Sequence, residues 1–147
     1  MTIRISAQKP ATNLQLPLFG CEVAAGFPSP ADDYIERKLS LDEHLIPHPA
    51  ATYFARASGD SMVGCGIYDG DLLVVDRSEP VSHNSIVVAC INGELTCKKV
   101  DLQHRRLLAA NRRYPAIPIC DDESLEVEGV VIHSIRHHKT VKYVKSA

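Results

Sequence analysis

The chain has 147 residues, of which 45% are hydrophobic and 23% are charged. These proportions are typical of a globular protein, and a chain of this length buries about two-thirds of the surface that it exposes when unfolded. The formal net charge of −2 does not favour a polyanion-binding surface, so we expect no direct sequence-specific binding of DNA.

The N-terminal segment, residues 1 to about 29, is predicted to be an extended, flexible arm. It shows neither helical nor sustained strand periodicity, and prolines and glycines interrupt it.

Two short helices are predicted next. Pro30 follows a serine and suits the first position of a helix that should run to about Lys38. Ser40 begins a capping box for the second helix, which Pro47 ends.

Strand-forming residues dominate the rest of the chain. The predicted strands are Thr52–Ala57, Asp71–Asp76, Ser85–Ile91, Glu94–Leu102, Arg105–Ala110 and Leu125–Arg136. Strands and helices do not alternate, so the predicted fold class is mainly β with an antiparallel sheet. The tail from His137 either extends the last strand or frays.

The dipeptide Asn92-Gly93 joins two of these strands and predicts a hairpin with a two-residue turn. In that register Lys98 lies opposite Val87 and shares a face of its strand with Val100, whereas Lys99 points to the other face. Burial among apolar side chains disfavours the charged form of an amine, so we expect a lowered pKa for Lys98. Lys98 is therefore the candidate base, and Lys99 is interpreted as a surface residue.

Ser61 lies in the segment Gly59-Asp60-Ser61-Met62, upstream of Lys98. A serine hydroxyl is a weak nucleophile until a neighbouring base takes its proton, and a desolvated lysine amine can be that base. Together the two residues predict serine–lysine catalysis. Asp60, next to the nucleophile, either tunes the site or caps the turn.

Several segments resemble the LexA/UmuD family of self-cleaving serine–lysine proteins, most closely its UmuD-like members. The segments around Ser61 and Lys98 carry the resemblance together with further motifs in the same order: Asp69–Asp71, Phe27–Tyr34, His48–Phe54 and Gly129–His133. It covers most of the chain. The resemblance implies a LexA/signal-peptidase-like antiparallel β domain in which Ser61 is the nucleophile and Lys98 the general base.

The resemblance also implies where the chain is cut. The family cleaves between a small residue and a glycine just before the Phe-Pro-Ser-Pro segment, which here is the bond Ala25–Gly26. The predicted organisation is a cleavable extended arm, residues 1–25, and a β-rich catalytic and dimerisation domain, residues 26–147. Small residues let an arm lie close against a cleft wall, although a plain small-residue linker is the alternative interpretation.

The segment before this bond is too short for the helix-turn-helix domain of LexA-type repressors, so a UmuD-like architecture is expected. It implies a homodimer that cleaves itself in the SOS response when RecA bound to single-stranded DNA stimulates it. The product would be the accessory subunit of an error-prone, Y-family translesion DNA polymerase. Two alternatives stay open: a non-catalytic clamp- or polymerase-binding module, and a serine–lysine protease that acts in trans.

A second motif lies upstream of the predicted cleavage site. The segment Gln15-Leu16-Pro17-Leu18-Phe19 resembles the peptide with which bacterial proteins bind the sliding clamp. Leu18 and Phe19 would fill an apolar pocket of the clamp, while Gln15 and Leu16 complete the motif. The alternative is that these arm residues pack on their own globule.

The remaining residues of interest give weaker signals. The five cysteines contain no C-x-x-C pair and are interpreted as reduced thiols at apolar positions. His133 and His137-His138 have no zinc-binding spacing with a cysteine, so we expect no metal and no cofactor. Asp69 and Asp71 are interpreted as turn and strand-edge residues.

The sequence has neither a signal-peptide pattern nor a membrane-spanning apolar run, which predicts a cytoplasmic protein.

Overall fold

The computed structural model describes residues 13–20, 22–26, 37–120 and 125–139. These residues fall into two compact units, which divide between Pro47 and His48, and each unit is described by itself. None of the helices in the described ranges is long and apolar enough to cross a membrane. The segment Phe27–Tyr34, which contributes to the family resemblance, lies outside the described residues, as does most of the predicted helix from Pro30.

Two short strands form the sheet of the N-terminal unit. β1 (Gln15–Leu18) pairs antiparallel with β2 (Arg37–Ser40), so that Gln15 lies opposite Ser40. The predicted helix is therefore wrong at Arg37 and Lys38, and the arm is more ordered at Gln15–Leu18 than predicted. The reason is that both segments complete their backbone hydrogen bonds with a distant partner, and such pairing outweighs weak local propensity.

The predicted second helix is confirmed as α1 (Leu41–Leu45), which ends before Pro47. Ser40 occupies its N-cap position in an extended conformation, but its side chain makes no capping hydrogen bond. The predicted capping box is therefore wrong in this detail. Ser40 is also the last residue of β2 and is buried, so its position is set by the strand pairing as well as by the helix.

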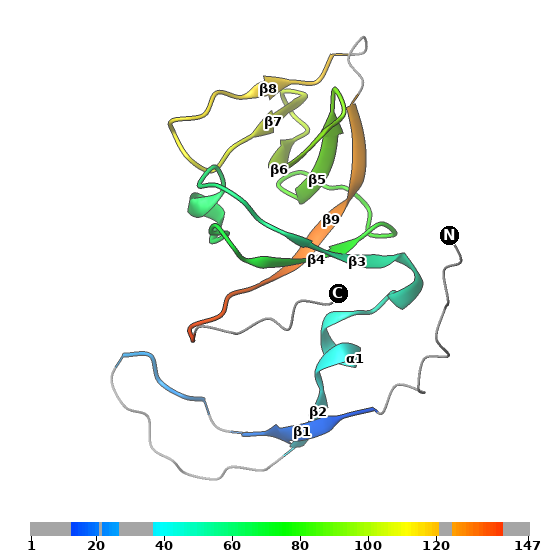
Figure 1. Cartoon of the computed structure of the whole chain (residues 1–147), viewed down its shortest axis with the longest axis vertical. Coiled ribbons are helices and arrows are strands. Elements are labelled where there is room, and N and C mark those ends of the chain that lie inside the picture. Colours follow the sequence, from blue (N-terminus) through cyan, green and yellow to red (C-terminus); the bar gives the residue numbers. More distant parts are fainter. Residues whose placement is uncertain (1–12, 21, 27–36, 121–124, 140–147) are drawn as a thin grey trace, which may run out of the picture. The chain divides into compact units, whose positions relative to one another are not determined.

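The C-terminal unit is one seven-stranded antiparallel sheet with the strand order β3-β4-β9-β5-β6-β7-β8 (Figure 1). Its strands are β3 (Thr52–Arg56), β4 (Leu72–Asp76), β5 (Ile86–Ile91), β6 (Glu94–Asp101), β7 (Arg106–Leu108), β8 (Ile117–Pro118) and β9 (Leu125–Ile135). The mainly β, antiparallel class is thus confirmed. Six of these strands lie within the predicted ranges, and β8 is additional. The short 3-10 helices η1 (Pro49–Ala51) and η2 (Val63–Cys65) flank β3 and precede β4.

The β5–β6 hairpin has the predicted register. Val87 pairs with Lys98, and Ile91 with Glu94. Asn92 and Gly93 both have positive φ, 49° and 81°, as the preferred two-residue hairpin turn requires. The register therefore decides which face of β6 each of the two adjacent lysines occupies.

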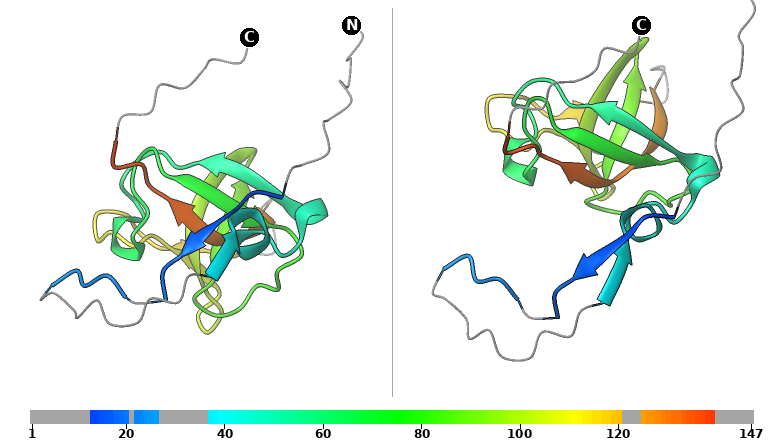
Figure 2. Two further views of the ribbon diagram at one scale, coloured as in Figure 1. Left: turned by 90° about the horizontal axis from the view of Figure 1, so that it is seen from below. Right: turned by 60° about the horizontal axis from the view of Figure 1, so that its bottom comes forward.

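Strand β9 holds the two ends of the sheet together. Its first half pairs with β5 and its second half with β4, and the register of both pairings shifts by a bulge. The strand bends across the sheet between these partners, as Figure 2 shows from two further sides. Gly129 lies at the bend with a φ of 152°, and a Cβ atom there would lie 2.7 Å from Cγ1 of Val75.

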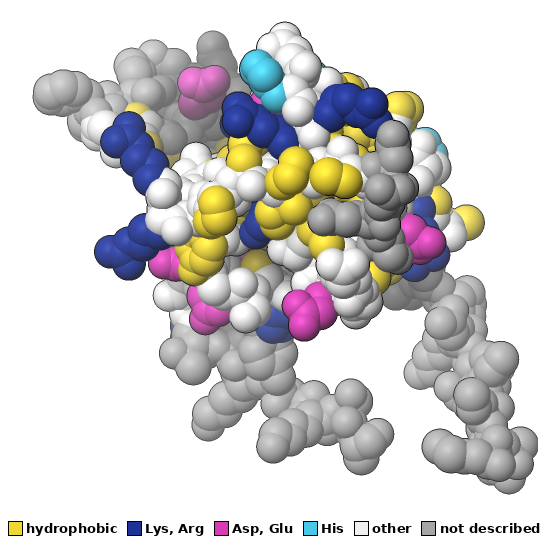
Figure 3. All heavy atoms as spheres, turned by 90° about the horizontal axis from the view of Figure 1, so that it is seen from above, with side chains coloured by type: hydrophobic (Ala, Val, Ile, Leu, Met, Phe, Trp, Pro, Cys, Tyr) yellow, Lys and Arg dark blue, Asp and Glu magenta, His cyan; other side chains and the backbone are white. Residues whose placement is uncertain are grey.

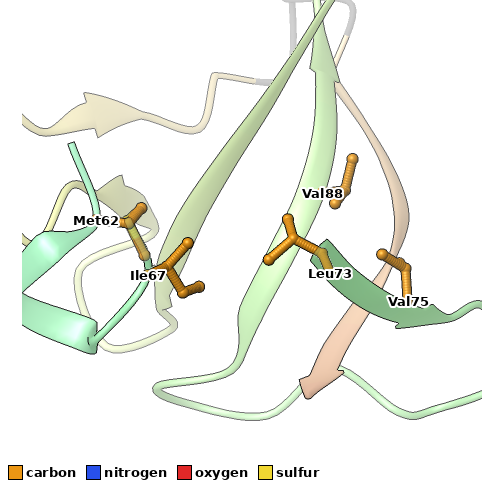
Figure 4. Close-up of a cluster of buried hydrophobic side chains, with 5 residues drawn as sticks. All are labelled: Met62, Ile67, Leu73, Val75 and Val88. Atoms are coloured by element: carbon orange, nitrogen blue, oxygen red, sulfur yellow. The ribbon is translucent and has the colours of Figure 1, made fainter. Parts of the chain in front are cut away.

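Two clusters of apolar side chains form the core. One consists of Met62, Ile67, Leu73, Val75 and Val88 (Figure 4). The other consists of Val87, Ala89, Val100, Leu107 and Val130. Burying such side chains stabilises the fold by about 1.5–3 kcal/mol each. Met62 directly follows Ser61, so the first cluster anchors the turn that carries the candidate nucleophile.

The surface of the molecule carries charges of both signs. On the face in Figure 3, basic and acidic side chains both surround a central group of hydrophobic side chains. This face therefore does not present a surface of one sign, in keeping with the formal net charge of −2.

Candidate active site

Ser61 lies in the loop between β3 and β4, just before η2. The next residue, Met62, has an exposed fraction of only 3% and packs into the first core cluster. Downstream, Gly66 ends η2 in the left-handed conformation with a φ of 80°, which glycine adopts without a steric penalty. The local sequence thus places Ser61, which is partly buried, at the edge of the core.

Lys98 reaches this serine from the middle of β6. Its Nζ atom lies 3.2 Å from Oγ of Ser61, and its exposed fraction is 8%. Burial lowers the pKa of the Lys98 amine below its ordinary value, and the neighbouring Cys97 opposes this shift weakly. The structure therefore brings together the two residues that the sequence singled out, and it gives the lysine the predicted direction of pKa shift.

The two side chains line adjoining hollows. Ser61 faces a hollow of about 280 Å³ whose other lining residues include Ala55, Ala57, Met62 and Cys97. Lys98 lines a second hollow, beside Ile117 at the edge of the sheet. Leu95 and Thr96 line both hollows, so the hydroxyl and the amine meet where the two adjoin. Small residues (Ala57, Ser58 and Gly59) precede Ser61 along the wall of its hollow, and larger apolar side chains such as Ile67 and Leu73 complete the lining.

The loop around Ser61 is held on one side by the turn before β4. The Gly59 N–H donates to Oδ1 of Asp69 at 2.8 Å, and the Gly70 N–H donates to the Ala57 carbonyl at 2.8 Å. Asp71 is buried, and Arg136 donates two hydrogen bonds to its carboxylate. The Arg136 hydrogen bonds hold the pKa of Asp71 below its usual value. Asp69 and Asp71 thus lie at the predicted turn and strand edge.

On its other side the loop contacts the turn between β7 and β8. Tyr114 Oη donates to Oδ1 of Asp60 at 2.6 Å, and Asn111 Nδ2 donates to the Asp60 carbonyl at 3.0 Å. The sequence analysis left the role of Asp60 open and did not single out Asn111 or Tyr114. The sequence contains only a weak signal for them, a turn-forming asparagine, because the contacts join residues 51 and 54 positions apart.

The predicted cleavage and clamp-binding residues belong to the N-terminal unit. Ala25 and Gly26 are exposed in an irregular segment, and a Cβ atom at Gly26 would contact nothing within 4 Å. The motif residues Leu16, Leu18 and Phe19 have exposed fractions of 57%, 46% and 57%. These apolar side chains are thus presented on β1 and directly after it, rather than buried.

One group of side chains in the described ranges has the composition of a metal site: His48, Asp76 and Glu79. Nδ1 of His48 lies 2.6 Å from Oδ2 of Asp76, and Ser78 donates to the other carboxylate oxygen. The Asp76 oxygens are therefore already hydrogen-bonded within the protein. The cysteines that the structure describes are free thiols, and burial raises the pKa of Cys97 to about 11.

Comparison with known proteins gives the family. The sequence-family model named Peptidase S24-like matches residues 17–132. Protein MucA of Salmonella typhimurium is 49% identical over 125 residues, which are 84% of this chain and 86% of that protein. Protein SamA of Salmonella typhimurium is 43% identical over 95% of this chain and 97% of its own length. LexA repressor 1 of Xanthomonas oryzae is 40% identical over 84% of this chain and 61% of the repressor. The chain belongs to the S24-like peptidases, as a UmuD-like SOS mutagenesis member of the LexA/UmuD family.

Proposed function

We propose that this protein cleaves its own chain at Ala25–Gly26, with Ser61 as nucleophile and Lys98 as general base. The observation that carries the proposal is the 3.2 Å contact between Nζ of the buried Lys98 and Oγ of Ser61. A lowered lysine pKa supports it, since only the neutral amine accepts a proton.

The reaction follows from these positions. Lys98 takes the hydroxyl proton while Ser61 Oγ attacks the carbonyl carbon of Ala25, and backbone N–H groups near Ser61 stabilise the oxyanion. The Ala25–Gly26 bond then breaks, and the Lys98 ammonium returns the proton to the amine of Gly26. Water hydrolyses the remaining ester. No metal or cofactor takes part in these steps. Because the bond and the nucleophile belong to one assembly, the attack is effectively unimolecular.

The biological setting of the proposal rests on family membership. In this setting the protein is a cytoplasmic homodimer, and RecA on single-stranded DNA favours the conformation in which the bond reaches Ser61. The product, residues 26–147, then serves as the accessory subunit of a Y-family translesion polymerase. The exposed apolar side chains of Leu16, Leu18 and Phe19 support a second contact, with the sliding clamp, which cleavage would remove.

The test is intact-mass spectrometry of the full chain after incubation at alkaline pH. The expected fragments are residues 1–25 and 26–147, and Ser61→Ala should yield neither. Residues 1–25 contain Arg4, Lys9 and Glu22, formally +1 in total, so the large fragment carries −3 instead of −2. Ala25→Asp should also block the cut, because a carboxylate would have to be desolvated in the cleft.

The same experiment separates the alternatives. A non-catalytic binding module would leave the unmodified chain and the Ser61→Ala chain equally intact. A protease that acts in trans would cut an added unrelated protein, and its own Ala25–Gly26 bond would survive. A cut at another bond that still requires Ser61 would contradict only the assignment of Ala25 and Gly26.

A further inference from the structure

The turn of residues 110–114 lies against the segment that carries Ser61. The Gly64 N–H donates to the Ala110 carbonyl at 2.8 Å. A Cβ atom at Gly64 would lie 2.5 Å from the same carbonyl oxygen, so the two backbones approach as closely as only glycine allows. With the two contacts to Asp60 described above, the turn meets the nucleophile segment both before and after Ser61.

Asn111 is oriented by its own turn. Its Oδ1 atom accepts a hydrogen bond from the Arg113 N–H at 3.1 Å, and its backbone carbonyl accepts one from the Tyr114 N–H at 3.1 Å. Because the oxygen of the side-chain amide is taken in this way, the NH₂ group must point at the Asp60 carbonyl, 3.0 Å away. The amide therefore acts as a fixed donor to Asp60.

Fixing the Asp60 carbonyl also fixes the N–H group of Ser61. Both belong to one peptide unit, which is planar and trans, so the carbonyl and the N–H point in opposite directions. The Asp60 oxygen accepts hydrogen bonds from Asn111 and, at 3.4 Å, from the Val63 N–H. Within the described part of the chain the Ser61 N–H has no acceptor. Because the Asp60 carbonyl points at Asn111, this donor points away from Asn111, and Ser61 itself lines the hollow of about 280 Å³.

Tyr114 restrains the side chain of Asp60. Its hydroxyl donates to Oδ1 of Asp60 at 2.6 Å, a short distance typical of a bond to a carboxylate. This bond raises the pKa of Tyr114, because loss of the phenol proton would leave two negative oxygens in contact. Asp60 is thus restrained through both its backbone and its side chain.

We propose that Asn111 and Tyr114 are positioning residues for the oxyanion of the self-cleavage reaction, because they hold the Asp60–Ser61 peptide with the Ser61 N–H directed at the attacked carbonyl. This inference rests on the proposed function and deepens it. Neither side chain touches the reacting atoms, and the proton transfer between Ser61 and Lys98 does not involve them. Their loss should therefore slow cleavage without changing the titration of the base.

The test uses two neutral substitutions in the full chain. Asn111→Leu keeps the approximate size of the side chain but removes both the donor to Asp60 and the acceptor of the Arg113 N–H. Tyr114→Phe removes only a hydroxyl. Tyr68→Phe is the matched control, since the Tyr68 hydroxyl makes no hydrogen bond to any residue that the structure describes. The rate of self-cleavage is measured across the alkaline pH range, and thermal unfolding shows that each variant is folded.

Asn111→Leu should lower the plateau rate at high pH about 10-fold or more, since losing one oxyanion donor altogether costs about 100-fold or more. Tyr114→Phe should lower it less, and Tyr68→Phe should leave it unchanged. The midpoint of each pH profile should match that of the unmodified chain. A folded Asn111→Leu chain that cleaves within about twofold of the unmodified rate, or one whose loss is entirely a shift of the midpoint, would overturn the proposal.

A second measurement keeps this test separate from the proposed function. In the Lys98→Ala background, which should remain uncut, the amide ¹H–¹⁵N signal of Ser61 should move on Asn111→Leu and on Tyr114→Phe but not on Tyr68→Phe. An unmoved Ser61 signal would overturn the positioning role whether or not the chain cleaves itself. If the Ser61 signal moves but the unmodified chain never cleaves itself, the restraint on the Asp60–Ser61 peptide stands and the proposed cleavage is rejected.

Discussion

At the scale of single residues, the proposed chemistry depends on which of two adjacent lysines faces Ser61. Side chains alternate between the two faces of a strand, so a shift of one residue in the β5–β6 register would exchange Lys98 and Lys99. The pairing of Val87 with Lys98 and the 3.2 Å contact with Ser61 place Lys98 at the serine. Lys99 pairs with Ile86 and Leu108 and is only partly buried.

The first prediction concerns these two lysines. Lys98→Ala should lower the rate of self-cleavage at least about 100-fold, the contribution typical of a positioned general base. Lys99→Ala should change the rate less than about twofold. The measurement is the appearance of residues 26–147 over time, by gel or intact mass. Loss of cleavage in the Lys99→Ala chain alone would contradict the assignment of the base.

The pH dependence has a definite sign. The rate should rise with pH while the neutral fraction of Lys98 grows, and it should become constant above the pKa of this amine. Since burial lowers that pKa, the plateau should be reached at a lower pH than for a solvent-exposed lysine. A rate that falls as the pH rises from neutral would argue against a lysine base.

Local patterns in the sequence were sufficient to single out Ser61 and Lys98 as candidates, but not the residues that contact the loop around Ser61. The Asn92-Gly93 turn and strict alternation along β6 predict the register of Lys98 without any tertiary information. Asn111 and Tyr114 reach Asp60 only because the β7–β8 turn folds back over the loop before η2. Nothing in the local sequence specifies that contact, since it depends on how distant loops pack.

At the scale of elements, the strands with a strong local sequence signal were predicted correctly. The elements that depend on pairing between distant segments were not. The six predicted strands of the main sheet have strong local signals, namely β-forming residues bounded by turn residues. The helix predicted through Lys38 rested on an N-terminal signal alone, and at Arg37 the chain instead pairs with Gln15–Leu18. β8 has two residues and is defined by its pairing with β7, so no periodicity could have predicted it.

The third prediction concerns the bend of β9. Gly129→Ala should lower the free energy of unfolding by about 1–3 kcal/mol, because the added methyl group overpacks the contact with Val75 and glycine alone adopts this φ without strain. Urea denaturation measures the change. Ser134→Ala, at an exposed position on the same strand, is the control and should stay within about 0.5 kcal/mol. Equal stability of both variants would mean that the bend relaxes at no cost.

At the scale of the whole molecule, the two units divide the proposed roles: the proposed catalytic residues lie in one unit, and the proposed cleavage site lies in the other. The C-terminal unit contains Ser61, Lys98 and the turns that restrain them, all within one sheet and its loops. The N-terminal unit contains the proposed cleavage site and the clamp-like motif, both exposed. In the proposed function, one reaction therefore removes the motif together with β1 and leaves the C-terminal unit intact.

The last prediction tests whether the motif Gln15–Phe19 binds the sliding clamp. Burying Leu18 and Phe19 in a partner pocket would contribute roughly 3–5 kcal/mol before the costs of association and ordering. The Leu18→Ala/Phe19→Ala double variant should therefore bind the clamp at least about tenfold more weakly, as measured by surface plasmon resonance. Its self-cleavage should be largely unchanged, because neither residue belongs to the β domain.

Leu14→Ala is the matched control, since Leu14 is equally apolar and has an exposed fraction of 66% but lies just outside the motif. It should bind the clamp like the unmodified chain, and the fragment 26–147 should bind as weakly as the double variant. Equal affinity of the full-length chain, the double variant and the fragment would show that the motif makes no contact, and that any binding to the clamp belongs to the β domain.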